Sequence, residues 1–133
     1  MLGNNIGEGR GKRTGRRVLA TTTIFKVEVS FEDRTKLLGQ DGMNIGTYAS
    51  VPKPDGSLAG EGQGVFATVD GEFATWTGLG TGRLLPGGAV NYRGSLNFST
   101  PSAKLGALNG NSVVFEFDVD AEGNTHSQFW EWK

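Results

Sequence analysis

Apolar and polar residues alternate with a period of two along most of the chain, and no long stretch follows the 3.6-residue period of an amphipathic helix. The alternation is clearest in two segments, Phe25–Phe31 and Val113–Val119, where every second residue is Phe or Val. Strands of this kind bury one face and leave the other in water. The sequence therefore predicts an all-β protein with eight strands, at residues 6–16, 22–31, 43–51, 58–69, 72–85, 89–99, 112–120 and 125–132.

Glycine-containing turn signals separate most of these strands. They are Pro54–Gly56, Asp70-Gly71, Pro86–Gly88 and Glu122–Asn124, and each is typical of a tight hairpin. Two longer connections, 33–42 and 101–110, are expected to hold a helical turn. Even strands with tight turns predict one domain, residues 1–133, folded as a closed antiparallel eight-stranded barrel, because closure leaves no exposed edge strand. A β-sandwich of the same strands is the alternative.

Composition excludes several classes of function. The chain has no Cys and a single His, so it has no disulfide and no conventional zinc site. We expect no metal and no cofactor. No apolar run is long enough to span a membrane and no signal-peptide pattern opens the chain, so a soluble cytoplasmic protein without a membrane partner is expected. The net charge of −1 argues against a nucleic-acid partner, and the early basic residues Arg10, Lys12, Arg13, Arg16 and Arg17 are interpreted as a solvated surface.

Turn lengths predict which side chains share a face, because a loop of known length fixes the register of its two strands. A three-residue loop at Pro54–Gly56 and a two-residue turn at Asp70-Gly71 are predicted, followed by a three-residue loop at Pro86–Gly88. Together these three turns predict one common interior face. That predicted interior consists of Ile45, Thr47, Val51, Glu61, Gln63, Val65, Trp76, Leu84, Val90, Tyr92, Leu96 and Phe98.

The predicted interior contains a carboxylate and an amide, Glu61 and Gln63, beside glycines that leave space around them. In one interpretation the glycines allow tight coiling, and Tyr92 or Trp76 covers the gaps. In the other, the space is a ligand cavity with Glu61 as its polar anchor. Burial would raise the pKa of such a carboxyl and suit it to proton abstraction, so Glu61 is the candidate catalytic residue. The candidate ligand-binding residues are Thr47, Glu61, Gln63, Trp76, Tyr92 and Phe98.

Two orientations stay open at this stage. In the first strand, either the glycines Gly7, Gly9 and Gly11 or the charged residues between them face inward. In the last hairpin, a three-residue loop at Ala121–Gly123 would place Phe129 inside, whereas a two- or four-residue loop would place Trp130 there.

Several segments resemble an uncharacterised group of small bacterial proteins with the allene-oxide-cyclase-type barrel, a calycin-like meander. The resemblance covers roughly residues 58–133 and is carried by the segments Thr77–Gly82, Tyr92–Leu96, Leu105–Asn109, Asp120–Asn124 and Trp130–Lys133. It implies an eight-stranded antiparallel barrel, and it allows a homodimer or a higher homo-oligomer. The plant cyclases act without a cofactor on a lipid epoxide held in the barrel, but none of their functional residues matches this chain position by position.

Three hypotheses of function follow. The first is a barrel that binds a small, partly apolar ligand in its interior. The second is a cofactor-independent isomerase or cyclase with Glu61 as acid or base. The third is a structural or interaction protein with a filled barrel, whose outer face uses Phe66, Phe73 and Leu79 at a subunit contact.

Overall fold

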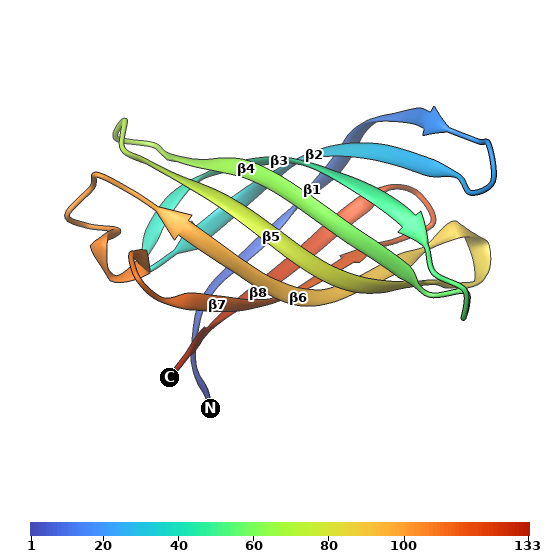
Figure 1. Cartoon of the computed structure of the whole chain (residues 1–133). Coiled ribbons are helices and arrows are strands. Elements are labelled where there is room, and N and C mark those ends of the chain that lie inside the picture. Colours follow the sequence, from blue (N-terminus) through green and yellow to red (C-terminus); the bar gives the residue numbers. More distant parts are fainter.

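A computed structural model describes residues 1–133 and confirms the closed, eight-stranded antiparallel barrel (Figure 1). Each strand pairs with the next one along the chain, and the last pairs with the first. The chain has no helix that could cross a membrane. The elements are β1 (Leu2–Ala20), β2 (Lys26–Leu37), β3 (Gln40–Pro52), β4 (Leu58–Thr68), β5 (Phe73–Leu84), the short 3₁₀ turn η1 (Pro86–Gly88), β6 (Val90–Ser99), a second 3₁₀ turn η2 (Gly106–Leu108), β7 (Ser112–Val119) and β8 (Asn124–Trp132).

One of the two predicted helical turns is present and the other is not. The connection 101–110 contains η2, as expected. Residues 33–42 instead continue β2 and begin β3, joined by a tight turn at Leu38 and Gly39. Both turn residues have positive φ, 51° and 77°, as a two-residue type I′ hairpin requires. The sequence prediction failed here because Leu38 is not a residue that normally marks such a turn.

Two of the three predicted registers are confirmed. Glu61 lies opposite Ala49, and Trp76 lies opposite Phe98. The register between β4 and β5 is shifted by one residue, so Val65 pairs with Thr75 rather than with Trp76. The connection is a three-residue loop, 69–71, closed by a hydrogen bond from the amide of Thr68 to the carbonyl of Glu72.

This shift reverses the predicted faces of β3 and β4, because side chains alternate with a period of two. Residues predicted inside are therefore outside: Ile45, Thr47, Val51, Glu61, Gln63 and Val65. Ile45 is 47% exposed and Val65 is 40% exposed. The opposite error affects Phe66, which was predicted on the outer face and is buried in the core. Asp70-Gly71 is a typical type I′ dipeptide, but here Gly71 supplies its positive φ to a longer loop.

Both orientations that the sequence left open are settled by the structure. In β1, Gly7, Gly9 and Gly11 face inward. In the last hairpin, a three-residue loop at 121–123 is closed by a hydrogen bond from the amide of Asp120 to the carbonyl of Asn124. Phe129 consequently lies opposite Phe115 and is 4% exposed in the core.

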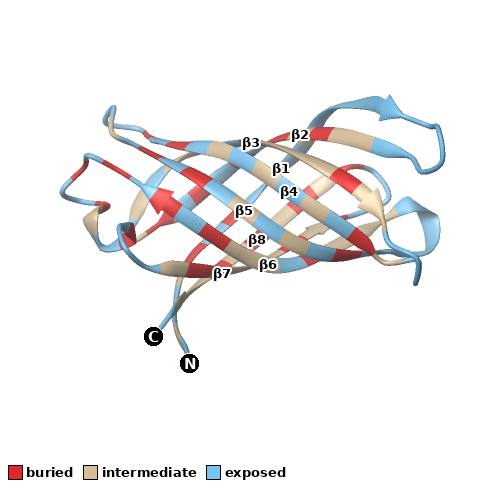
Figure 2. Cartoon of the chain, viewed as in Figure 1, coloured by how far each residue is buried: buried red, intermediate tan, exposed pale blue.

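Large rings fill the barrel by packing against inward-facing glycines. Figure 2 shows buried and exposed residues alternating along the strands. A Cβ atom added at Gly64 would lie 2.4 Å from the ring of Trp76, and one added at Gly82 would lie 2.6 Å from the ring of Tyr92. The rings therefore occupy the space that side chains at these glycines would take, in agreement with the interpretation that Trp76 and Tyr92 cover the space beside the glycines.

Gly64→Ala tests this complementarity. The added methyl group would meet both the ring of Trp76 and the carbonyl oxygen of Ile45, at 2.4 and 2.5 Å. Overpacking of this kind should lower the free energy of unfolding by about 1–3 kcal/mol, measured by urea denaturation. Gly15→Ala is the matched control, because no atom lies within 4 Å of its added Cβ. An equal effect of the two substitutions would contradict the prediction.

Candidate ligand cavity in the barrel

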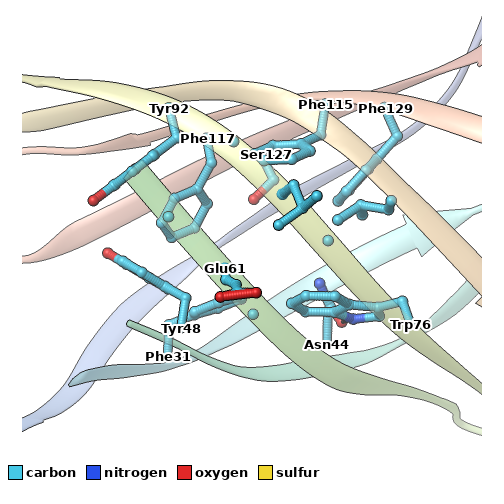
Figure 3. A pocket seen from close by; sticks show the side chains of 16 residues that line it. Phe31, Asn44, Tyr48, Glu61, Trp76, Tyr92, Phe115, Phe117, Ser127 and Phe129 are labelled. Carbon is cyan, nitrogen blue, oxygen red and sulfur yellow. Dashed lines mark hydrogen bonds between the residues drawn. The ribbon is translucent and has the colours of Figure 1, made fainter. Parts of the chain in front are cut away.

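A cavity of about 60 Å³ lies inside the barrel, between aromatic rings and the inner face of β4 and β5 (Figure 3). Besides Trp76, the inward-facing residues of β4 and β5 at the cavity are the glycines Gly60, Gly62, Gly78 and Gly80, so the cavity meets backbone at these positions. The residues around the cavity are Phe31, Asn44, Tyr48, Gly60, Glu61, Gly62, Trp76, Gly78, Leu79, Gly80, Tyr92, Leu96, Phe115, Phe117, Ser127 and Phe129.

Five of the aromatic residues that line the cavity form one connected cluster. The ring centroids of Phe31 and Phe117 are 4.8 Å apart, and Tyr48 packs edge-on against Phe117 at 5.8 Å and against Tyr92 at 5.3 Å. Phe31 also lies in a stacked arrangement with Trp76, at 6.4 Å. Offset and edge-to-face pairs in this distance range are favourable, so each ring fixes its neighbours.

The polar atoms of two cavity rings are already hydrogen-bonded. The hydroxyls of Tyr92 and Ser50 share a hydrogen bond of 2.5 Å. At another point of the wall, the indole Nε1–H of Trp76 donates to Oδ1 of Asn44 at 2.8 Å. Burial raises the pKa of Tyr48 and of Tyr92, so both remain neutral phenols. The wall of the cavity is therefore mainly apolar and carries no charge.

The carboxyl group inside the barrel belongs to Asp33. This side chain is completely buried, and it accepts hydrogen bonds from the hydroxyls of Thr125 and Ser127. Burial raises the pKa of Asp33, and the two hydroxyl donors partly offset that effect. Ser127 lines the cavity and its Oγ lies 3.2 Å from Oδ2 of Asp33, so the carboxyl lies directly behind the cavity wall.

Glycines of β1 make the contact between Asp33 and β8 possible. Asp33 lies on β2 and its partners lie on β8, on opposite sides of β1. A Cβ atom at Gly11 would lie 2.6 Å from Oδ1 of Asp33, and one at Gly9 would lie 2.5 Å from Oγ1 of Thr35. The bare inner face of β1 therefore allows side chains from β2 and β8 to meet above it.

Sequence reasoning missed Asp33, although a signal for it was present. The predicted strand ended at Phe31, where the connection 33–42 was assumed to begin. Continuing the alternation of Val29 and Phe31 by one step places Asp33 on the same inner face, where the structure has it.

Three of the predicted site residues face the interior. Trp76 and Tyr92 line the cavity, and Phe98 is buried opposite Trp76 without reaching the cavity wall. The other three lie on the outer face, so their predicted inward orientation is wrong for the reason given by the register. Thr47 and Gln63 are paired there, and Ser30 shares a hydrogen bond with the Thr47 hydroxyl.

Glu61 is part of the cavity wall only through its position between Gly60 and Gly62, and its side chain is exposed. It faces outward with its cross-strand partners Ala49 and Leu79. No group of three or more His, Asp or Glu side chains is arranged to hold a metal ion.

Comparisons with known proteins identify the fold but no family. No protein-family model and no curated protein matches the sequence. The chain is similar in structure to a protein with unknown function from Clostridium acetobutylicum, with a TM-score of 0.82, 12% identity, and 98% of this chain and 97% of that chain covered. A β-barrel-like protein from Acinetobacter baumannii gives 0.81 at 12% identity, covering 100% and 96%.

An enzyme from Penicillium herquei is similar over 96% of this chain and 92% of its own, with a TM-score of 0.70 and 16% identity. Identities this low show a shared barrel and no more. None of these three proteins is described as an allene oxide cyclase, so that relationship stays a prediction.

The buried carboxyl predicts a specific pH dependence of stability. Because the pKa of Asp33 is raised above its ordinary value of 3.8, the folded protein holds this proton more tightly than the unfolded chain. The stabilisation is complete below the unfolded pKa and disappears as the pH rises through the folded pKa. The free energy of unfolding of the wild type, minus that of Asp33→Asn, should therefore fall as the pH rises above 3.8. Urea denaturation across a pH series measures this difference, and a constant difference would refute the prediction.

Proposed function

We propose that the barrel binds a small, mainly apolar molecule in its interior cavity. The observation that supports this most directly is the space of about 60 Å³ among the rings of the barrel core. At about 10–15 Å³ for each water, this space corresponds to about four to six water molecules.

The chemistry of the wall favours a flat ligand with carbon surface. Trp76, Phe117 and Phe129 offer ring edges and faces, and the opposite wall is the glycine backbone of β4 and β5. Trp76 and Tyr92 are therefore proposed contacts, and Phe98 supports Trp76 from the neighbouring strand.

The catalytic hypothesis based on Glu61 has no geometric basis, since its exposed side chain does not face the cavity. The third hypothesis, a subunit contact on the outer face, keeps two of its three residues, because Phe73 and Leu79 are 47% and 64% exposed. It stays a prediction.

Furan is a suitable probe of the cavity because it is a small, flat and weakly polar ring. We expect furan to shift the indole N–H resonance of Trp76 in ¹H–¹⁵N spectra, with assignment by Trp76→Phe. Gly80→Ala places a methyl group 3.1 Å from Cζ of Phe115, inside the cavity, and should weaken furan binding by about fivefold or more.

Gly106→Ala is the matched control for this experiment, because it lies outside the barrel in η2 and its added Cβ meets no atom within 4 Å. It should bind furan like the wild type. The proposal fails if furan leaves the Trp76 resonance unchanged up to its solubility limit.

A further inference from the structure

The position of Asp33 is not explained by packing. The side chain is completely buried, and its hydrogen-bond donors are two neutral hydroxyls rather than a Lys, Arg or His side chain. Burying a carboxyl without a cation is unfavourable, and an apolar residue of similar volume would often stabilise a core better. The effect of Asp33 on the groups around it accounts for its position.

Asp33 fixes the orientation of the Ser127 hydroxyl. A serine hydroxyl has one hydrogen to donate and two lone pairs that can accept. The hydrogen of Ser127 is directed to Oδ2 of Asp33, and Ser127 Oγ makes no other hydrogen bond in the protein. Ser127 also lines the cavity (Figure 3), so its free lone pairs provide a hydrogen-bond acceptor at the cavity wall.

A second cavity residue, Asn44, is oriented in the complementary way. Its Oδ1 accepts the hydrogen bond from the indole N–H of Trp76. This bond fixes which side-chain atom of Asn44 is the oxygen and which is the Nδ2 nitrogen. Nδ2 makes no hydrogen bond in the protein, and Asn44 lines the cavity. The amide nitrogen is therefore a free donor.

The acceptor and the donor lie on either side of Asp33. Asn44 is its cross-strand neighbour on β3, and Ser127 is its hydrogen-bond partner on β8. We propose that Asn44 and Ser127 form a two-point polar site in the cavity for a small neutral molecule that carries both a hydrogen-bond donor and an acceptor, such as an azole, an amide or an alcohol. This inference rests on the proposed function and adds the chemical class of the ligand. Asp33 is a positioning residue in this site.

The affinity of a ligand for this cavity should depend strongly on whether the ligand carries a hydrogen-bond donor. In a low-dielectric cavity, a donor on the ligand gains a hydrogen bond to Ser127, whereas a ligand without one leaves the serine lone pairs unpaired. A net hydrogen bond of about 1 kcal/mol corresponds to about a fivefold difference in affinity. The apolar walls still supply most of the binding free energy.

Three five-membered rings of nearly equal size separate the contribution of the apolar walls from those of a donor and an acceptor on the ligand. Furan has no donor, pyrrole has an N–H donor, and pyrazole has an N–H donor beside a nitrogen acceptor. Dissociation constants for all three are measured from the Trp76 indole resonance in the wild type and in Ser127→Ala. The substitution should weaken pyrrole and pyrazole by about fivefold and leave furan within about twofold. Pyrazole should bind more tightly than pyrrole in both proteins, because Asn44 is intact.

Thr125→Val is the matched control. It removes the other hydroxyl that donates to Asp33, but Thr125 does not line the cavity. The ratio of pyrazole to furan affinity should be unchanged, even though the protein loses stability. If Asp33 and its two hydroxyl donors had a purely structural role, both variants would instead change the affinity for all three ligands in parallel. If Ser127→Ala does not fold, Ser127→Cys takes its place, because a thiol is the weaker acceptor.

The outcomes separate the two proposals. If none of the three rings shifts the Trp76 resonance, the proposed function fails and the two-point site fails with it. If all three bind but Ser127→Ala leaves their relative affinities unchanged, the cavity binds ligands and the two-point site is rejected.

Discussion

The fit between aromatic rings and bare glycine backbone is the constraint on which the rest of this structure depends. An eight-stranded barrel encloses just enough space for side chains to fill it. Here Phe31 and Trp76 occupy the space that side chains at Gly46 and Gly64 would otherwise take. The remaining space lies where the glycines of β4 and β5 are only partly covered by rings. The position of the cavity therefore follows from the distribution of glycine in the sequence.

Much of this architecture was predictable because alternation and turn chemistry are local signals. They gave the strand number, the meander order and two of three tested registers. The inward orientation of Trp76, Tyr92 and Phe98 was correct because it depends on the loop at Pro86–Gly88 alone. One added loop residue before Glu72 was enough to reverse β3 and β4, since the length of this loop fixes the faces of the strands before it relative to those of the strands after it.

The polar part of the cavity was not predictable in the same way. Its members come from three strands, and each was hidden by a separate error or ambiguity. Asp33 was assigned to a connection, Asn44 lay on a strand with reversed faces, and Ser127 belonged to a hairpin whose loop length was open. Only a closed barrel with every register fixed brings these three side chains together. A site of this kind depends on long-range pairing, which a single sequence specifies weakly.

The Asp33 cluster also bears on how the barrel closes. The barrel closes where β1, which pairs with β2 on one side, pairs with β8 on the other. Asp33 and its two hydroxyl donors connect those two neighbours across the glycines of β1, so they stabilise one register at the site of closure. A shift in the register of β8 would be unfavourable, because it would leave the buried carboxyl of Asp33 without its hydroxyl donors. In the proposed site, the same hydrogen bond sets the orientation of the Ser127 hydroxyl at the cavity wall. One buried side chain therefore contributes both to the register at the closure of the barrel and to the polar part of the proposed site.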